Sequence, residues 1–159
     1  MGEVLDRVEA LRRRAAARAL SQTFVFTNGC FDILHPGHVA LLRQARQQGQ
    51  YLMVGLNSDR SVRGLKGEGR PVQDEGSRAA VLAALSDVDG VVLFDEETPL
   101  ELIRALMPDV LVKGGDYRPD QVVGRDVVEK GGGRVAIVPL VPGQSSSSIV
   151  TKLRAAART

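Results

Sequence analysis

The sequence passes from a short apolar segment into a helical one through Thr27-Asn28-Gly29-Cys30-Phe31-Asp32-Ile33-Leu34-His35-Pro36-Gly37-His38. The apolar run Phe24-Val25-Phe26 precedes this stretch, and the segment 39–47 that follows it has helical character. Pro36 suits the first turn of a helix, because a residue at that position needs no backbone N–H donor. The stretch therefore predicts a buried strand, a turn and a helix that begins near Pro36.

Two histidines, His35 and His38, lie at the start of this predicted helix, and the chain contains no others. Free backbone N–H groups and the helix dipole make a helix N-terminus suitable for an anion. Imidazoles at positions i and i+3 can point the same way and add donors, and Gly37 between them permits close backbone approach. One such histidine is more often a cap or a packed core residue, but the pair favours a polyphosphate site. A zinc site, which normally takes three or four protein ligands, is less well supported, because the nearest carboxylate is Asp32 and the one cysteine, Cys30, lies on the strand side of the turn.

The composition is that of one globular domain with a core. The chain has 159 residues, of which 43% are hydrophobic and 25% charged. A net charge of +2 and 4% aromatic residues argue against nucleic acid as a partner. A single cysteine fits a reducing compartment, and no apolar run is long enough to span a bilayer. We therefore expect a cytoplasmic protein that binds neither nucleic acid nor a membrane.

The N-terminal segment 1–20 is predicted to be an amphipathic helix. Val4, Val8, Leu11 and Ala15 form a stripe at helical spacing, which we expect to be packed against a partner surface. That surface is either the same domain or a second copy of the chain, so a homodimer is one expectation. The rest of the predicted domain 1–159 is a catalytic core over 22–154.

Apolar strand patterns alternate with helical ones through the rest of the chain. The alternation predicts a parallel sheet covered on both faces, with its ligand at the carboxyl ends of the strands. Helices are expected over 58–63 capped by Ser58, over 74–85 capped by Asp74, over 99–106 capped by Thr98, over 119–130 and over 147–157. The five predicted strands are 24–27, 51–56, 91–94, 109–113 and 134–138.

Three further strings follow strands or precede a helix at the predicted ligand edge. The glycine-rich segment 64–71 carries Lys66 and Arg70. It is expected to be either a mobile loop that closes over bound phosphates or a plain surface turn. The string 113–117 pairs glycines with Asp116, which suits a substrate contact or a turn held by the aspartate. The serines of 145–148 are typical of helix capping and also of phosphate binding.

Together these strings resemble the nucleotidyltransferase family with an H-x-G-H signature, and within it the heptose 1-phosphate adenylyltransferases of the ADP-heptose pathway. The match covers residues 22–154 in order and lies in 27–38, 54–59, 65–71, 78–82, 98–100 and 110–117. The resemblance implies a Rossmann-like αβα three-layer sandwich, here with a five-stranded parallel sheet. It also implies transfer of AMP from ATP to a heptose 1-phosphate, giving ADP-heptose and pyrophosphate, with Mg²⁺ between the phosphates.

The resemblance also assigns roles to residues. Catalytic roles fall on His35, His38 and Lys66, and sugar-phosphate contacts on Asn57 and Asp116. Asp32 is expected to orient a histidine, and no protein ligand to a metal is expected. Nucleotide and phosphate contacts are expected from Thr27, Asn28, Gly29, Cys30, Phe31, Asp32, Gly37, Arg70, Gly114, Ser145, Ser146 and Ser147.

The chain departs from the family in two places. The family usually has Ser-Thr-Thr where this chain has Ser145-Ser146-Ser147, which keeps the hydroxyls. An aromatic or basic residue is common where Gln144 stands, which puts base contacts there in doubt. Related bifunctional enzymes carry an upstream sugar kinase, for which this chain has no room, so a separate kinase is expected to supply the substrate.

The residues themselves leave two alternatives open. One is the same chemistry with another base and acceptor, as in a cytidylyltransferase for glycerol 3-phosphate or another small alcohol phosphate. The other is a nucleotide-binding module without turnover. The His35/His38 pair and Lys66 favour an enzyme, since simple binding needs no donors aimed at a transition state.

Overall fold

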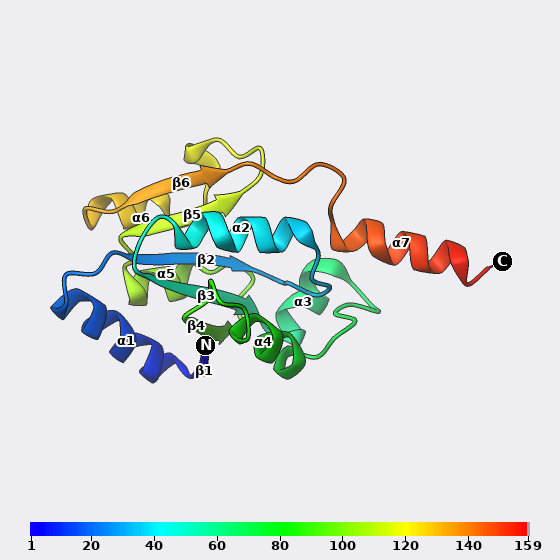
Figure 1. The fold of residues 1–159 in the computed structure, drawn as a ribbon, viewed down its shortest axis with the longest axis horizontal. Coiled ribbons are helices and arrows are strands. Elements are labelled where there is room, and N and C mark those ends of the chain that lie inside the picture. Colours follow the sequence, from blue (N-terminus) through cyan, green and yellow to red (C-terminus); the bar gives the residue numbers. More distant parts are fainter. Residues whose placement is uncertain (159) are drawn as a thin grey trace.

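The computed structural model describes residues 1–158, so Thr159, with which the predicted domain ends, lies outside the described residues. It shows a single parallel sheet between two layers of helices (Figure 1). The sheet has six strands in the order β1-β4-β3-β2-β5-β6. They are β1 Glu3–Leu5, β2 Phe24–Gly29, β3 Tyr51–Asn57, β4 Gly90–Phe94, β5 Val110–Gly114 and β6 Arg134–Val138. The predicted parallel αβα sandwich is confirmed, with one strand more than the five expected.

The helices divide between the two faces of the sheet. On one face lie α2 (Pro36–Arg46) and α4 (Glu75–Ala83), and on the other lie α1 (Arg7–Ala19), α5 (Leu100–Leu106) and α6 (Arg125–Lys130). The remaining helices are α3 (Asp59–Lys66), the 3-10 turn η1 (Pro119–Gln121) and α7 (Ser146–Ala156). The last of these extends away from the sheet towards the C-terminus (Figure 1).

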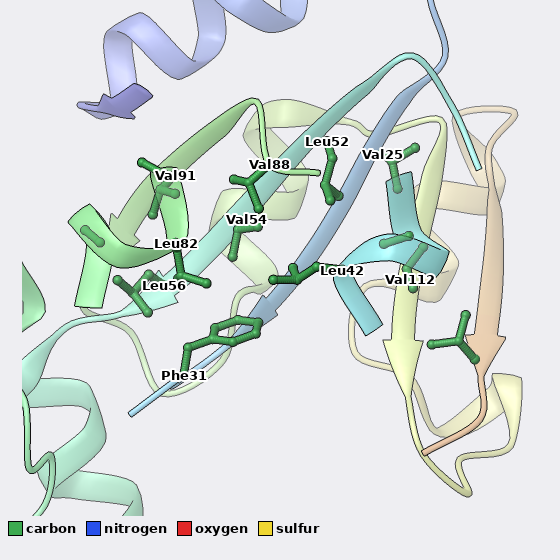
Figure 2. Packing of buried hydrophobic residues seen from close by; sticks show 14 of the residues in the cluster. Val25, Phe31, Leu42, Leu52, Val54, Leu56, Leu82, Val88, Val91 and Val112 are labelled. Atoms are coloured by element: carbon green, nitrogen blue, oxygen red, sulfur yellow. The ribbon is translucent and has the colours of Figure 1, made fainter. Parts of the chain in front are cut away.

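Each face of the sheet has its own hydrophobic core, because side chains alternate between the faces along every strand. Figure 2 shows the core under α2 and α4, where Val25, Leu52 and Val112 from three strands meet Leu42 of α2 and Leu82 of α4. The opposite core contains Phe24, Phe26, Met53 and Leu111. These buried strands position the loops at their carboxyl ends, where the predicted site residues lie.

The extra strand comes from the N-terminal segment, where the predicted helix begins too early. Residues 3–5 form β1, which pairs with β4, and α1 begins only after Asp6, which caps it. Val4, Val8, Leu11 and Ala15 are exposed, so they do not pack on the same domain, which was one of the two surfaces expected. The buried face of α1 consists instead of Ala10, Arg14 and Ala17. Arg14 belongs there because its guanidinium forms a bidentate contact with Asp109 at 2.9 and 3.0 Å.

Other element boundaries were predicted with mixed success. Ser58 and Asp74 cap α3 and α4 as expected. Thr98 does not cap α5, because that helix starts one residue later, with Pro99 in the cap position. The predicted helix 119–130 is interrupted at Gly124, whose φ of 86° is incompatible with a continuous helix. Among residues 1–158, no helix is long and apolar enough to cross a membrane.

The order of the strands defines where a ligand can bind. β2 lies between β3 and β5 in the sheet. The strands β3 and β4, which follow β2 in the chain, lie on one side of it, and the next two, β5 and β6, lie on the other side. Loops that follow β2 and β5 therefore separate at the carboxyl edge and leave a crevice between them. The segment 27–38 follows β2 and lies at this crevice.

Candidate active site

The two histidines lie face to face at the start of α2. Their ring centroids are 3.8 Å apart, and the ring planes are inclined by 25°. His35 is the N-cap of the helix, and its Nδ1 accepts a hydrogen bond of 3.1 Å from the backbone N–H of Gly37. The sequence prediction that both imidazoles face the same way is therefore confirmed.

The cap bond determines which nitrogen of His35 carries a proton. A ring nitrogen that accepts from an N–H has its lone pair engaged and cannot itself be protonated. In neutral His35 the proton is therefore on Nε2, which is left as a hydrogen-bond donor. Gly37 contributes to this arrangement, since a Cβ at that position would lie only 2.9 Å from the His35 ring. The glycine thus admits the imidazole, whereas the sequence suggested that it admits a ligand.

His38 is held in its neutral form. Burial, together with the neighbouring His35 and Lys66, lowers the pKa of His38 to about 4, while the backbone of Ile33 acts in the opposite direction. The ring packs against Phe31, with 5.0 Å between centroids. At neutral pH both rings are therefore uncharged, and Lys66 is the nearby cation.

These groups line a cleft of about 310 Å³ at the crevice between β2 and β5. Leu41, Leu140, Val141 and Gln144 complete its wall, and the described lining contains no Asp or Glu. The structure brings together most of the predicted catalytic and phosphate-binding residues, which are His35, His38, Lys66, Asn28, Gly29, Cys30, Phe31, Gly37, Gly114, Ser145, Ser146 and Ser147.

Lys66 and Cys30 lie close to each other in this cleft. Lys66 is the last residue of α3 rather than part of the following loop, and it forms no ion pair with any described residue. Burial raises the pKa of the Cys30 thiol, although the charge of Lys66 opposes the shift. The cysteine therefore stays a neutral thiol, and Lys66 remains available for an anionic ligand.

The serines at the start of α7 include the helix cap that the sequence suggested, and they also line the cleft. Ser145 is the N-cap and accepts from the backbone N–H of Ser148 at 3.0 Å. Ser146 is buried and donates to the carbonyl of Ile33 at 3.0 Å, which ties α7 to the segment before His35. Both also line the cleft with Ser147. The helix N-terminus thus faces the same space as the histidines.

Three predicted residues have structural roles instead of the expected ones. Thr27 is buried and its hydroxyl donates to the carbonyl of Val112 at 2.9 Å, joining β2 to β5. Asp32 does not orient a histidine. Its carboxylate accepts from Nε of Arg70 at 2.8 Å and from the backbone N–H groups of Val72 and Gln73. Arg70 is thereby held away from the cleft, whose wall contains none of these three predicted residues.

The two residues predicted for the sugar phosphate are separated. Asn57 lines a second cavity of about 400 Å³, and its side-chain amide donates to Oγ of Ser61 at 2.9 Å. Asp116 is exposed and lines neither the histidine cleft nor this second cavity. The second cavity shares Asn28, Gly29 and Cys30 with the cleft, so the two spaces adjoin.

Arg78 is a site-supporting residue to which the sequence analysis gave no role. Its side chain is fully buried, and its guanidinium donates to the carbonyls of Cys30, Asn57 and Gln73 and to Oδ1 of Asp59. It thereby joins the loops that follow β2 and β3 to α4. The available signal was an arginine on the Ala/Leu face of a predicted helix, where only a fully paired charge can be buried.

A metal ion at this site would be coordinated mainly by the bound substrate rather than by protein side chains. No group of three or more His, Cys, Asp or Glu side chains in residues 1–158 could hold a metal ion. The carboxylate of Asp32, which is the acidic group nearest in sequence to the histidines, is already occupied by Arg70, Val72 and Gln73. Mg²⁺ that enters with a polyphosphate would therefore be coordinated by phosphate oxygens and water.

The fold and the cleft together define an α/β nucleotide-binding protein of the Rossmann type, with its ligand at the point where the strand order reverses. The family model described as cytidylyltransferase-like matches residues 26–151. The chain therefore belongs to the cytidylyltransferase-like family, and the resemblance predicted from the sequence is confirmed.

Individual relatives agree with this assignment. The chain is 59% identical over 152 residues to the bifunctional protein HldE of Mesorhizobium japonicum, covering 96% of this chain and 31% of that protein. It is 61% identical over 132 residues to the HldE protein of Gluconobacter oxydans, covering 83% and 28%. The chain thus spans about a third of the length of these curated relatives.

A solved structure is also similar. The lipopolysaccharide core biosynthesis protein from Thermoplasma volcanium aligns with a TM-score of 0.62 and 30% sequence identity. The alignment covers 76% of this chain and 97% of that one. The similarity therefore extends over nearly the whole of the smaller protein.

Proposed function

We propose that this chain is an adenylyltransferase that transfers AMP from ATP to a heptose 1-phosphate and releases pyrophosphate. The observation that carries the proposal is the stacked, neutral His35/His38 pair, which faces Lys66 and the N-terminus of α7 across one cleft. Identities of 55–61% with HldE proteins support it, as does the likeness to a lipopolysaccharide core biosynthesis protein.

The reaction needs positioning and charge stabilisation rather than a protein nucleophile. An oxygen of the sugar phosphate, already anionic at neutral pH, forms a bond to the α-phosphorus of ATP. The bond from that phosphorus to the bridging oxygen breaks, and its electrons leave with pyrophosphate. Catalysis then depends on donors that bind the transferring group and the leaving group more strongly in the transition state. ATP is expected to enter as its Mg²⁺ complex, which neutralises part of the phosphate charge.

The residues of the cleft have matching properties. Nε2–H of His35 is a donor because Nδ1 is engaged by Gly37. Neutral His38 adds a second donor, and Lys66 supplies the positive charge that the histidines lack. The free N–H groups at the start of α7 suit a further phosphate oxygen. We assign phosphate contacts to these groups and to the backbone of Asn28–Cys30.

A screen of pyrophosphate release tests the proposal. ATP and CTP are each combined with a heptose 1-phosphate and with glycerol 3-phosphate, at one magnesium concentration. We expect kcat/KM with ATP and the heptose 1-phosphate to exceed that with CTP by at least tenfold, because one unpaired polar group in a base pocket costs about 1–3 kcal/mol. A preference for CTP and glycerol 3-phosphate would favour the cytidylyltransferase alternative. Nucleotide binding without turnover would favour a binding module.

Two partner assignments accompany the proposal. We propose that a sugar kinase activity supplies the heptose 1-phosphate, since the phosphate must be added before AMP transfer. We also propose a homodimer, for which the exposed stripe Val4, Val8, Leu11 and Ala15 offers an apolar contact surface. Light scattering at micromolar concentration measures the oligomeric state, and a monomeric mass would contradict the dimer.

A further inference from the structure

The second cavity lies on the opposite face of the sheet from the histidine cleft. Side chains alternate along β5, so Lys113 points to the face of Leu111 and lines the second cavity, while Gly114 lines the histidine cleft. The two spaces adjoin at Asn28, Gly29 and Cys30, which line both. A group bound in the second cavity can therefore reach the cleft past the end of β2.

Lys113 is a half-buried cation that no described carboxylate neutralises. It forms no ion pair with residues 1–158, although most cations buried to this degree in the structure are paired, as Arg14 and Arg70 are. Its Nζ instead lies over the ring of Tyr117, 5.1 Å from the centroid. An aromatic face holds an ammonium group in place without supplying a countercharge. Lys113 is thus positioned and remains able to bind an anion.

Each of the two adjoining spaces contains one such lysine. Lys66 lies in the histidine cleft and Lys113 in the second cavity, on either side of the shared wall. This arrangement suits two anionic substrates that must meet at the wall. We propose that the second cavity binds the phosphorylated acceptor, a sugar 1-phosphate if the proposed function is right, and that Lys113 binds its phosphate group.

The rest of the second cavity suits a polyhydroxy compound. Its apolar side chains include Leu111 and Val122, and its polar groups include Asn28, Gln121 and Glu97. Side-chain amides and a carboxylate can bind hydroxyl groups as donors and acceptors, and the exposed Tyr117 ring is a flat surface for the C–H face of a sugar. The volume of about 400 Å³ lies within the range of small-molecule sites.

Steady-state kinetics of Lys113→Met tests this inference, with Lys113→Arg as the conservative variant and Lys130→Met, at an exposed position of α6, as the matched control. Removal of one charge-assisted contact should raise KM for the acceptor at least tenfold and change KM for ATP less than twofold. Lys113→Arg should recover most of the loss. Free heptose without its phosphate, used as a competitive inhibitor, should bind Lys113→Met as well as it binds the original chain.

The outcomes separate this inference from the proposed function. An unchanged acceptor KM in Lys113→Met would overturn the inference while leaving the adenylyltransferase intact, and so would an equal loss of free heptose binding. If the original chain uses glycerol 3-phosphate but no heptose 1-phosphate, the proposed function is wrong, and Lys113 is then judged by the KM for glycerol 3-phosphate in the same way. If neither heptose 1-phosphate nor glycerol 3-phosphate supports turnover, both the proposed function and this inference are wrong.

Discussion

The carboxylate of Asp32 and the guanidinium of Arg70 form a buried ion pair of 2.8 Å, with side-chain exposures of 0% and 11%. The same carboxylate accepts hydrogen bonds from the backbone N–H groups of Val72 and Gln73. Arg70 therefore fixes the segment after the glycine-rich loop instead of reaching for a phosphate. Among the loop residues suggested by the sequence, Lys66 alone faces the histidine cleft.

Replacement of Asp32 by Asn should destabilise the protein by about 3 kcal/mol, because it leaves a nearly buried guanidinium without its countercharge. The free energy of unfolding in urea measures this effect. Asp74→Asn is the matched control, since Asp74 is an exposed helix cap that Asn replaces at little cost. Equal stabilities of the two variants would show that the Asp32–Arg70 pair contributes little.

Replacement of Arg78 by Met should lower the free energy of unfolding at least as much as Asp32→Asn does. The substitution leaves the buried carbonyls of Cys30 and Asn57 without a hydrogen-bond donor. We expect a loss of about 3–5 kcal/mol in the free energy of unfolding. Arg104→Met, at an exposed position of α5, removes an ion pair with Glu101 and should cost less than about 1 kcal/mol. A small effect at Arg78 would mean that the two loops are held by other contacts.

The cap and the catalytic role of His35 can be separated by two substitutions. His35→Ala removes both, while His35→Asn keeps a capping side chain at the start of α2. Both variants should lower kcat by about 100-fold with a smaller change in KM for ATP, by analogy with loss of one oxyanion donor. Only the alanine variant should also lose about 1 kcal/mol of stability. Near-normal kcat in His35→Asn would make His35 a structural cap only.

The low pKa of His38 makes stability depend on pH in a defined window. The unfolded chain takes up a proton near the ordinary histidine pKa of 6.5, but the folded protein does so only near 4. Stability from this group is therefore complete above about pH 6.5 and is lost as the pH falls towards 4. Urea unfolding at several pH values, compared between the original chain and His38→Asn, isolates the effect. A difference that does not vary between pH 7 and 4.5 would contradict it.

The sequence predicts those features that depend on neighbouring residues. The caps Ser58 and Asp74 and the strand 134–138 were recognised because their signals are local. The histidine pair was recognised because both rings belong to one turn of one helix.

The features that the sequence did not predict depend on distant partners. β1 has only three residues and forms because it pairs with β4. The pairing of Asp32 with Arg70 joins residues 38 positions apart, and the contacts of Arg78 span three segments. Gly124, where the predicted helix is interrupted, packs so closely on Ile103 that a Cβ there would lie 2.8 Å from it. None of these contacts leaves a periodic pattern in the sequence.

The fate of the AMP group tests the central claim most directly. ATP labelled with phosphorus-32 at the α-position is incubated with the chain, Mg²⁺ and a heptose 1-phosphate, and the products are separated. The account predicts that the label moves into ADP-heptose in proportion to the pyrophosphate released. Label that stays in ATP, or that appears in AMP or ADP without a sugar nucleotide, would contradict it.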